Sequence, residues 1–175
     1  MILLSRFQEI MNEVFLLLGS NEGDRLNWLQ KAIELLCKNV GKVITSTSVY
    51  ETAAWGLQEQ QSFYNLVLKM ETIQDVLQLL SSIQNIEHIC GRQRTQKWGA
   101  RTLDIDILYF NCDIIEKETL KVPHPFLAER RFTLVPLVAI AAEKVHPALH
   151  KTNEQLLIEC SDQLPVTRID VVLKT

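Results

Sequence analysis

The chain has 175 residues, of which 47% are hydrophobic and 22% are charged, and its 18 Lys and Arg against 21 Asp and Glu give a formal net charge of −3. These values are typical of one globular domain, large enough to form a hydrophobic core without disulfides or a structural metal. The six Gly and five Pro leave no collagen-like or low-complexity segment. The slightly acidic balance argues against a general nucleic-acid-binding protein.

The cysteines and the longest apolar segment bear on the cellular location. Cys37, Cys90, Cys112 and Cys160 form neither a C-x-x-C pair nor a zinc-ligand pattern, so we expect reduced thiols in a cytoplasmic protein. The longest apolar run, residues 134–142, is far shorter than the ~20 residues that span a bilayer. We therefore expect no membrane segment.

The chain divides into an extension and one domain. Residues 1–13 contain an apolar patch that is too short for a secretory signal and precedes the first strand pattern. We predict that residues 1–13 are an N-terminal extension, either disordered or left by a mis-assigned start. Residues 14–175 are predicted to form a single domain, and we expect it to be a monomer.

Four segments in the first two thirds of the chain have the composition of β-strands, and two have the spacing of amphipathic helices. The helices are predicted from Asp24, a suitable capping residue, to Gly41, and from the capping sequence 72–75 to Gly91. The predicted strands are residues 14–18, 43–50, 65–70 and 103–110.

The order strand, helix, strand, strand, helix, strand predicts an α+β fold. In this ferredoxin-like arrangement, both helices pack on one face of an antiparallel sheet. C-terminal additions follow: a turn at Pro123 and Pro125, a short helix over residues 133–142 and a last strand over residues 166–173. We find no linker that would separate domains.

The strand over residues 103–110 carries two carboxylates that the alternation of strand side chains brings together. Asp104 and Asp106 are two positions apart, so both side chains lie on one face of the sheet. Adjacent carboxylates repel each other, and Mg²⁺, which commonly takes one or two protein carboxylates, relieves this repulsion. For an isolated D-x-D pair, however, an ordinary exposed strand is the better explanation.

A cationic segment directly precedes this strand. Residues 91–101 contain three arginines and one lysine but no acidic residue. Alone, such a run is usually a solvated loop. Together with Asp104 and Asp106, it predicts a site at which carboxylates hold metal and guanidinium groups bind the phosphate oxygens of a polyphosphate. Standard nucleotide-loop, zinc-protease and serine-hydrolase motifs are absent from the sequence.

Aromatic residues suggest a second half of the site. Phe63 and Asn65 share one face of a predicted strand, and Phe132 follows Arg130 and Arg131. Aromatic residues of this kind usually belong to the core. The alternative is that a flat heterocycle stacks on Phe63 while the amide of Asn65 binds its hydrogen-bonding edge.

The segment Lys97-Trp98-Gly99-Ala100-Arg101-Thr102-Leu103-Asp104-Ile105-Asp106-Ile107-Leu108 resembles the signature of the 6-hydroxymethyl-7,8-dihydropterin pyrophosphokinases of folate biosynthesis. Supporting matches extend from Val14 to about Ala142 and include Leu18-Gly19-Ser20-Asn21, Phe63-Tyr64-Asn65 and Arg131-Phe132. The family has the ferredoxin-like fold that the order of elements predicts.

The resemblance implies that the hydroxymethyl oxygen of the pterin attacks the β-phosphorus of ATP, which transfers pyrophosphate and releases AMP. Asp104 and Asp106 would bind two Mg²⁺ ions, and Arg92 and Arg101 would contact phosphates as catalytic residues. By the same resemblance, the pterin-binding residues are Thr52, Ala54, Phe63, Asn65 and Phe132. The nucleotide-binding residues are Gln84, Glu87, Arg94, Trp98, Arg101, His124 and Arg130. For His124, a structural role in the turn between two prolines is an alternative.

A different class of function remains open on the sequence alone. A ferredoxin-like module without catalysis could bind RNA or a nucleotide, with the cationic loop on phosphates and the aromatic side chains on bases. Asp104 and Asp106 and the negative net charge oppose binding to a nucleic-acid backbone. We therefore expect ATP and the pterin as small-molecule partners and no nucleic-acid partner.

Overall fold

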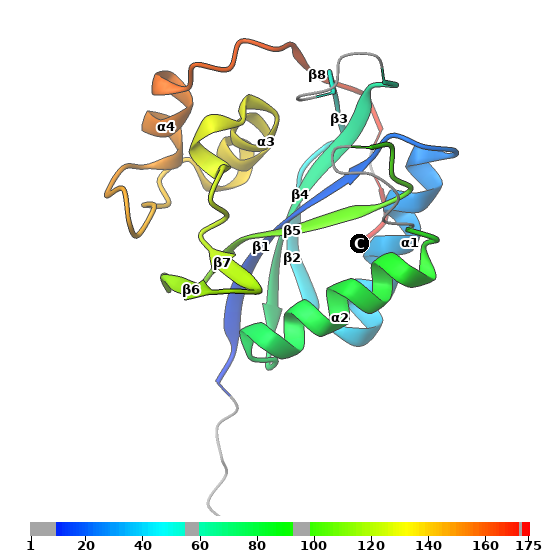
Figure 1. The fold of residues 1–175 in the computed structure, drawn as a ribbon, viewed down its shortest axis with the longest axis horizontal. Coiled ribbons are helices and arrows are strands. Elements are labelled where there is room, and N and C mark those ends of the chain that lie inside the picture. The colour runs from blue at the N-terminus through cyan, green and yellow to red at the C-terminus, as the bar shows by residue number, and fades with distance from the viewer. Residues whose placement is uncertain (1–9, 55–59, 93–98, 172) are drawn as a thin grey trace, which may run out of the picture.

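A twisted antiparallel sheet with helices on both faces forms the body of the molecule (Figure 1). The computed structural model describes residues 10–54, 60–92, 99–171 and 173–175. The strands are β1 (Asn12–Ser20), β2 (Lys42–Ser46), β3 (Tyr50–Thr52), β4 (Phe63–Thr72), β5 (Asp104–Phe110) and β8 (Val166–Arg168), with a separate hairpin of β6 (Ile115–Lys117) and β7 (Leu120–Val122). The helices are α1 (Arg25–Asn39), α2 (Val76–Ile89), α3 (Arg131–Ala141) and α4 (Asn153–Glu159), with a 3₁₀ turn over Leu127–Glu129.

The long strand β1 is the centre of the sheet. It pairs antiparallel with β4 on one side and with β5 on the other, and the strand order is β5-β1-β4-β3-β8, with β2 also paired to β4. The predicted ferredoxin-like α+β fold is therefore confirmed. Strand β5 is an edge strand of this sheet, and it carries the two aspartates.

Helices α1 and α2 cover one face of the sheet, as predicted. Alternate residues of β1, such as Leu16 and Leu18, point into this layer and are fully buried. Asp24 caps α1 as expected, by accepting a hydrogen bond from Asn27 N. The cap of α2 differs from the prediction, because Asp75 pairs with Gln78 in the capping box while the Thr72 hydroxyl donates to Val40 O.

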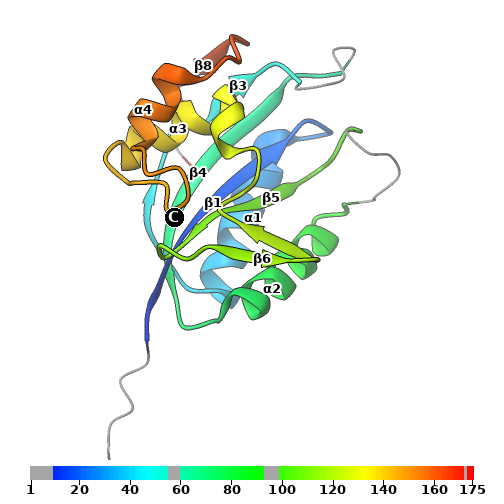
Figure 2. The ribbon, with the colours of Figure 1, turned by 60° about the vertical axis from the view of Figure 1, so that its left-hand side comes forward.

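The C-terminal additions cover the other face of the sheet. Figure 2 shows α3 and α4 on the side of the sheet opposite to α1 and α2. Their apolar residues form a second core with Phe15, Leu17 and Val67 of the sheet. The buried Tyr109 hydroxyl of β5 donates to Asn153 Oδ1 of α4 at 2.7 Å, which ties the additions to the central sheet.

Several predicted segments differ in extent from the structure, three of them in ways that matter for the fold. Strand β1 begins at Asn12, which pairs with Thr72, so residues 12–13 belong to the sheet and not to the extension. The strand predicted over residues 43–50 is broken, because the Thr47 hydroxyl replaces a main-chain carbonyl as the acceptor of Val67 N–H. The last strand ends at Arg168.

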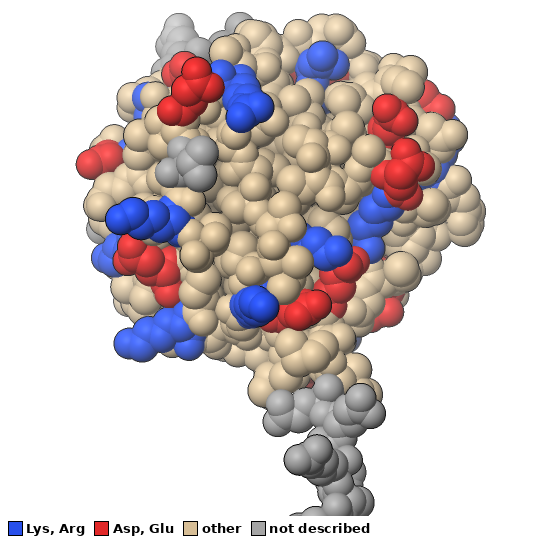
Figure 3. Space-filling model, turned by 180° about the vertical axis from the view of Figure 1, so that it is seen from behind, with Lys and Arg blue, Asp and Glu red and all other residues tan. Residues whose placement is uncertain are grey.

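The cysteines and the charged surface residues are placed as follows. Cys37 and Cys112 are exposed, Cys90 and Cys160 are buried, and all four are free thiols. On the face shown in Figure 3, charged residues of both signs are scattered among uncharged ones, without a broad area of positive charge. No helix in the described residues is both long and apolar enough to cross a membrane.

The contact between β5 and α4 gives a test of how the additions stabilise the fold. We expect Tyr109→Phe to lower the free energy of unfolding by about 1–2 kcal/mol, because it leaves the buried Asn153 Oδ1 without its donor. Urea unfolding measures this change. The control Tyr64→Phe removes a hydroxyl that makes no hydrogen bond within the described residues, and it should change stability by less than about 0.5 kcal/mol. Equal effects of the two variants would contradict the prediction.

Candidate active site

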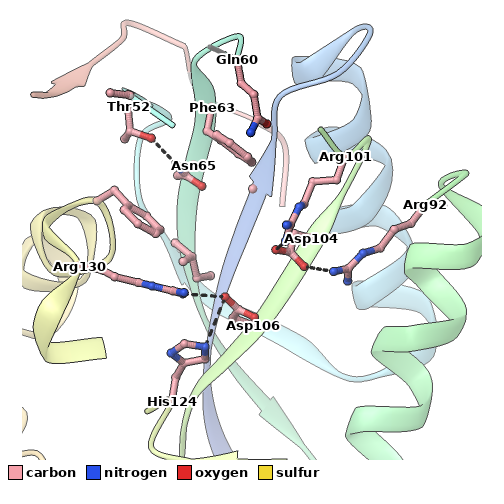
Figure 4. Close-up of a pocket in the computed structure, with 14 residues that line it drawn as sticks. Thr52, Gln60, Phe63, Asn65, Arg92, Arg101, Asp104, Asp106, His124 and Arg130 are labelled. Carbon is pink, nitrogen blue, oxygen red and sulfur yellow. Dashed lines mark hydrogen bonds and ion pairs between the residues drawn. The ribbon is translucent and has the colours of Figure 1, made fainter. Parts of the chain in front are cut away.

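A pocket opens on the α3 face of the sheet, beyond the point where the second core ends (Figure 4). Strands β1, β4 and β5 supply its floor, and the start of α3 and the loop before it supply one wall. The residues that line it are Leu17, Gly19, Thr52, Ala53, Gln60, Phe63, Asn65, Arg92, Arg101, Asp104, Asp106, His124, Arg130 and Phe132.

The two aspartates of β5 lie in this pocket, as their spacing predicts. Asp104 is opposite Gly19 of β1, and Asp106 is opposite Leu17. The intervening Ile105 points into the core beneath α1 and α2. Strand geometry therefore brings two carboxylates side by side on the pocket floor.

Two arginines neutralise Asp104. Arg92 NH2 lies 2.7 Å from Asp104 Oδ1, and Arg101 NH1 forms an ion pair with Asp104 Oδ2. Arg92 also pairs with Glu87 of α2. The guanidinium groups predicted to bind phosphate thus lie at the carboxylate of Asp104.

Asp106 is less well compensated than Asp104. Arg130 NH1 lies 3.7 Å from Asp106 Oδ2, beyond a normal hydrogen bond. Burial and the charge of Asp104 raise the pKa of Asp106 to about 7, although Arg130 opposes the shift. Burial and the charge of Arg130 lower the pKa of His124 to about 4, so its contact with Asp106 at 3.8 Å is not an ion pair at neutral pH.

The weak charge compensation of Asp106 fits a bound divalent cation. No group of three or more His, Cys, Asp or Glu side chains that could hold a metal occurs among the described residues. Two adjacent carboxylates fit Mg²⁺, because this ion completes its coordination with water and phosphate oxygens. A cation beside Asp104 and Asp106 would also offset the burial and the charge of Asp104, which together raise the pKa of Asp106.

The opposite side of the pocket is aromatic and carries the amides of Asn65 and Gln60. Phe63 and Phe132 line it, and Asn65 Nδ2 donates to Thr52 Oγ1 at 2.7 Å. Gly19 lies beneath this group, where a Cβ would stand 2.7 Å from Asn65 Oδ1 and 3.7 Å from the Phe63 ring. The missing side chain of Gly19 therefore leaves room for the Asn65 amide.

Three residues expected at the site do not line this pocket, and two lie outside the described residues. Ala53, and not the buried Ala54, lines the pocket. Gln84 and Glu87 belong to α2 and border a separate hollow beside Arg92. Arg94 and Trp98 lie outside the described residues.

Glu87 has an unexpected environment for a nucleotide-binding residue. Its side chain is only 5% exposed, and its Oε1 accepts a hydrogen bond from Ile105 N at 2.9 Å on the outer edge of β5. Burial raises its pKa, while the charge of Arg92 acts in the opposite direction. In this structure Glu87 holds the edge strand and Arg92 in place.

Four pocket residues were missed by the sequence analysis: Leu17, Gly19, Ala53, which is next to the predicted Ala54, and Gln60. The alternation of β1 could have placed Leu17 and Gly19 on the same face as the aspartates once the pairing of β1 with β5 was known. Gln60 lies in a loop, and nothing in its sequence neighbourhood signals a pocket residue.

Known proteins share both the sequence and the fold. The model of the 7,8-dihydro-6-hydroxymethylpterin-pyrophosphokinase family matches residues 15–142. The 2-amino-4-hydroxy-6-hydroxymethyldihydropteridine pyrophosphokinase of Aquifex aeolicus is 43% identical over 141 residues, which cover 81% of this chain and 88% of that protein. The enzyme of the same name from Bacillus subtilis is 39% identical over 145 residues, 82% of this chain and 87% of the relative.

A solved structure has the same fold at much lower identity. The Plasmodium falciparum HPPK-DHPS crystallised with pterin and p-hydroxybenzoate superposes with a TM-score of 0.68 and 21% identity, over 87% of this chain and 44% of that one. The match of the family model to most of the chain, the relatives above one third identity and the conserved architecture agree. The chain belongs to the 7,8-dihydro-6-hydroxymethylpterin-pyrophosphokinase family.

Proposed function

We propose that this chain performs the reaction of its family, the transfer of pyrophosphate from ATP to the hydroxymethyl group of 6-hydroxymethyl-7,8-dihydropterin, with release of AMP. One observation carries the assignment of the site. Asp104 and Asp106 lie on the floor of one pocket, between a group of cations and a surface of aromatic and amide side chains. These two halves fit a polyphosphate and a flat heterocycle, respectively.

Asp104 and Asp106 are the proposed ligands of two Mg²⁺ ions. When bound, the ions supply charge neutralisation and alignment of the phosphates. The chain's own contribution is a pair of carboxylates fixed on a strand that is held on both edges. Strand β1 pairs with β5 on one edge, and Glu87 accepts Ile105 N–H on the other.

Arg92 and Arg101 are the proposed catalytic cations. Each is paired with Asp104 in this structure, and a metal ion held by Asp104 would leave both guanidinium groups available to phosphate oxygens. They then stabilise the negative charge that develops during transfer. Arg130 and His124 lie at Asp106 and are proposed to contact the nucleotide. Gln84, Arg94 and Trp98 are further proposed nucleotide-binding residues.

Phe63, Phe132, Asn65 and Thr52 are the proposed pterin-binding residues. The phenyl rings supply apolar faces for stacking. The Asn65 amide is fixed by its bond to Thr52 Oγ1, which leaves Asn65 Oδ1 to accept from a ring N–H or amino group. Stacking and this bond orient the hydroxymethyl group toward the metal and phosphates, and no covalent enzyme intermediate is required.

The binding-module alternative receives little support. An RNA-binding surface requires a broad cationic area, whereas the arginines of this pocket are paired with carboxylates in the ligand-free protein. We also propose that the enzyme acts in the cytoplasm, because two of its free thiols are exposed. The expectation of a monomer stays a prediction.

Removal of one carboxylate tests the metal assignment. We expect Asp106→Ala to lower kcat by about 10³-fold while the fold is retained, because several kcal/mol of charge stabilisation is lost. Chromatography of AMP formed from ATP, Mg²⁺ and the pterin measures the rate. The control Asp113→Ala changes an exposed turn residue and should keep full activity. Wild-type turnover by Asp106→Ala would disprove the metal role.

The raised pKa of Asp106 predicts that Asp106→Asn stabilises the protein in the presence of EDTA. An acid with a raised pKa in the folded state costs stability as the pH rises from about 4, its unfolded value, to about 7. Asp106→Asn lacks this cost, so its free energy of unfolding should exceed that of the wild type by an amount that grows over this pH range to about 2 kcal/mol. This is roughly half of what the pKa shift alone would give, because the Asp106 side chain is 30% exposed and solvent screens its charge. Urea unfolding between pH 4 and 8 measures the difference, and a pH-independent difference would contradict it.

Gly19 gives a test of the pterin half of the site. We expect Gly19→Ala to raise the KM for the pterin about tenfold, because its Cβ displaces the Asn65 amide, while the KM for ATP changes little. Steady-state kinetics with each substrate varied in turn separate the two constants. An unchanged pterin KM would show that Asn65 does not bind the pterin in the position proposed.

A further inference from the structure

The start of α3 carries Phe132 into the pocket, and Asp162 caps this helix from a distant segment. Arg130 occupies the position before the helix, but its side chain extends toward Asp106 (Figure 4). Asp162 Oδ2 accepts a hydrogen bond from Arg131 N, the first N–H of the helix, at 3.0 Å. A carboxylate suits this place, because the helix dipole and the N–H groups of the first turn attract negative charge.

The segment around Asp162 is itself held on both sides. Cys160 is buried in the second core, and Asp162 Oδ1 accepts from Leu164 N at 3.0 Å. Further along the chain, β8 pairs with β3, and Val166 lies opposite Thr52. Figure 1 shows this segment running from α4 past α3 to β8 beside β3. Both oxygens of Asp162 are therefore used, and its place relative to the sheet is fixed.

These contacts join the two sides of the pterin half of the pocket. On one side, Thr52 of β3 accepts from Asn65 Nδ2 at 2.7 Å and lies opposite Phe63 of β4. On the other side, Phe132 follows directly after the residue whose N–H binds Asp162. One segment thus contacts the Phe63 side through β3 and the Phe132 side through Asp162.

A shift at the start of α3 would act mainly on Phe132. Its ring is joined to the main chain through one methylene group, so the ring moves when the helix start moves. Stacking tolerates little movement, because a gap of about 1 Å loses roughly half of the dispersion attraction. Arg130 responds differently, since its long side chain can keep its place near Asp106 while its main chain moves.

We propose that Asp162 is a positioning residue for the pterin. By capping α3 from a segment anchored to β3, it holds Phe132 at the separation from Phe63 that a flat heterocycle requires. The family model matches residues 15–142, so Asp162 lies in the part of the chain beyond that match. The inference rests on the proposed function and gives this C-terminal segment a part in substrate recognition.

Steady-state kinetics of AMP formation, with the pterin and ATP varied in turn, test this role. Asp162→Ala removes both acceptor oxygens. We expect it to raise the KM for the pterin about fivefold, while kcat and the KM for ATP stay within about twofold of the wild type. Asp162→Asn keeps one acceptor oxygen and should raise the pterin KM less. Both variants remove the negative charge, so the difference between them reports the hydrogen bonds.

Two controls separate positioning from loss of charge and from loss of stability. Asp170→Ala removes an exposed acidic residue of the same C-terminal segment and should leave all three constants unchanged. Tyr109→Phe weakens the attachment of α4 to β5 at a residue that does not line the pocket, so it should keep the wild-type pterin KM. Melting temperatures show whether each variant is folded, and the near-isosteric Asp162→Asn remains informative if Asp162→Ala does not fold.

Three results would overturn the inference: a wild-type pterin KM in every Asp162 variant that folds, an equal rise of the KM for ATP, or the same rise of the pterin KM in Tyr109→Phe. A failure of the proposed function looks different. In that case the wild-type protein itself would form no AMP from ATP and the pterin.

Discussion

The partial burial of two adjacent carboxylates, Asp104 and Asp106, on the pocket floor is the constraint on which the rest of the site depends. Antiparallel pairing with β1 fixes both side chains on one face, so they cannot separate. In this structure, Arg92 and Arg101 neutralise the first, while the second keeps a raised pKa, mainly because it is buried. The fold therefore maintains a charge imbalance, and the proposed divalent cations would relieve it and leave two guanidinium groups to phosphate.

The spacing of apolar residues predicted the central strands and the two helices that pack on them. A continuous apolar run located β1. Alternation along β5 placed Asp104 and Asp106 on one face, because side-chain direction in a strand has a period of two. Three- and four-residue spacing located α1 and α2. Errors occurred where a side chain competes with the main chain, as at Thr47, whose hydroxyl replaces a carbonyl and interrupts a strand.

Contacts between residues that are far apart in the sequence could not be predicted from the spacing of residue types along the chain. Family resemblance assigned Glu87 to the nucleotide, whereas the structure shows it buried against β5, because strand pairing exposes an unpaired Ile105 N–H at the sheet edge. The resemblance ends near Ala142 and gave no role to Asp162, whose partner Arg131 lies 31 residues away. Such roles arise only when folding brings these distant segments together at one end of the sheet.

The identity of the nucleotide product tests the central claim most directly. The protein is incubated with ATP, Mg²⁺ and reduced 6-hydroxymethylpterin, and with mixtures that lack each component in turn, and the nucleotides are separated by chromatography. The account predicts AMP only in the complete mixture, in an amount equal to the pterin diphosphate formed. Formation of ADP, or no turnover by protein shown to be folded, would contradict it.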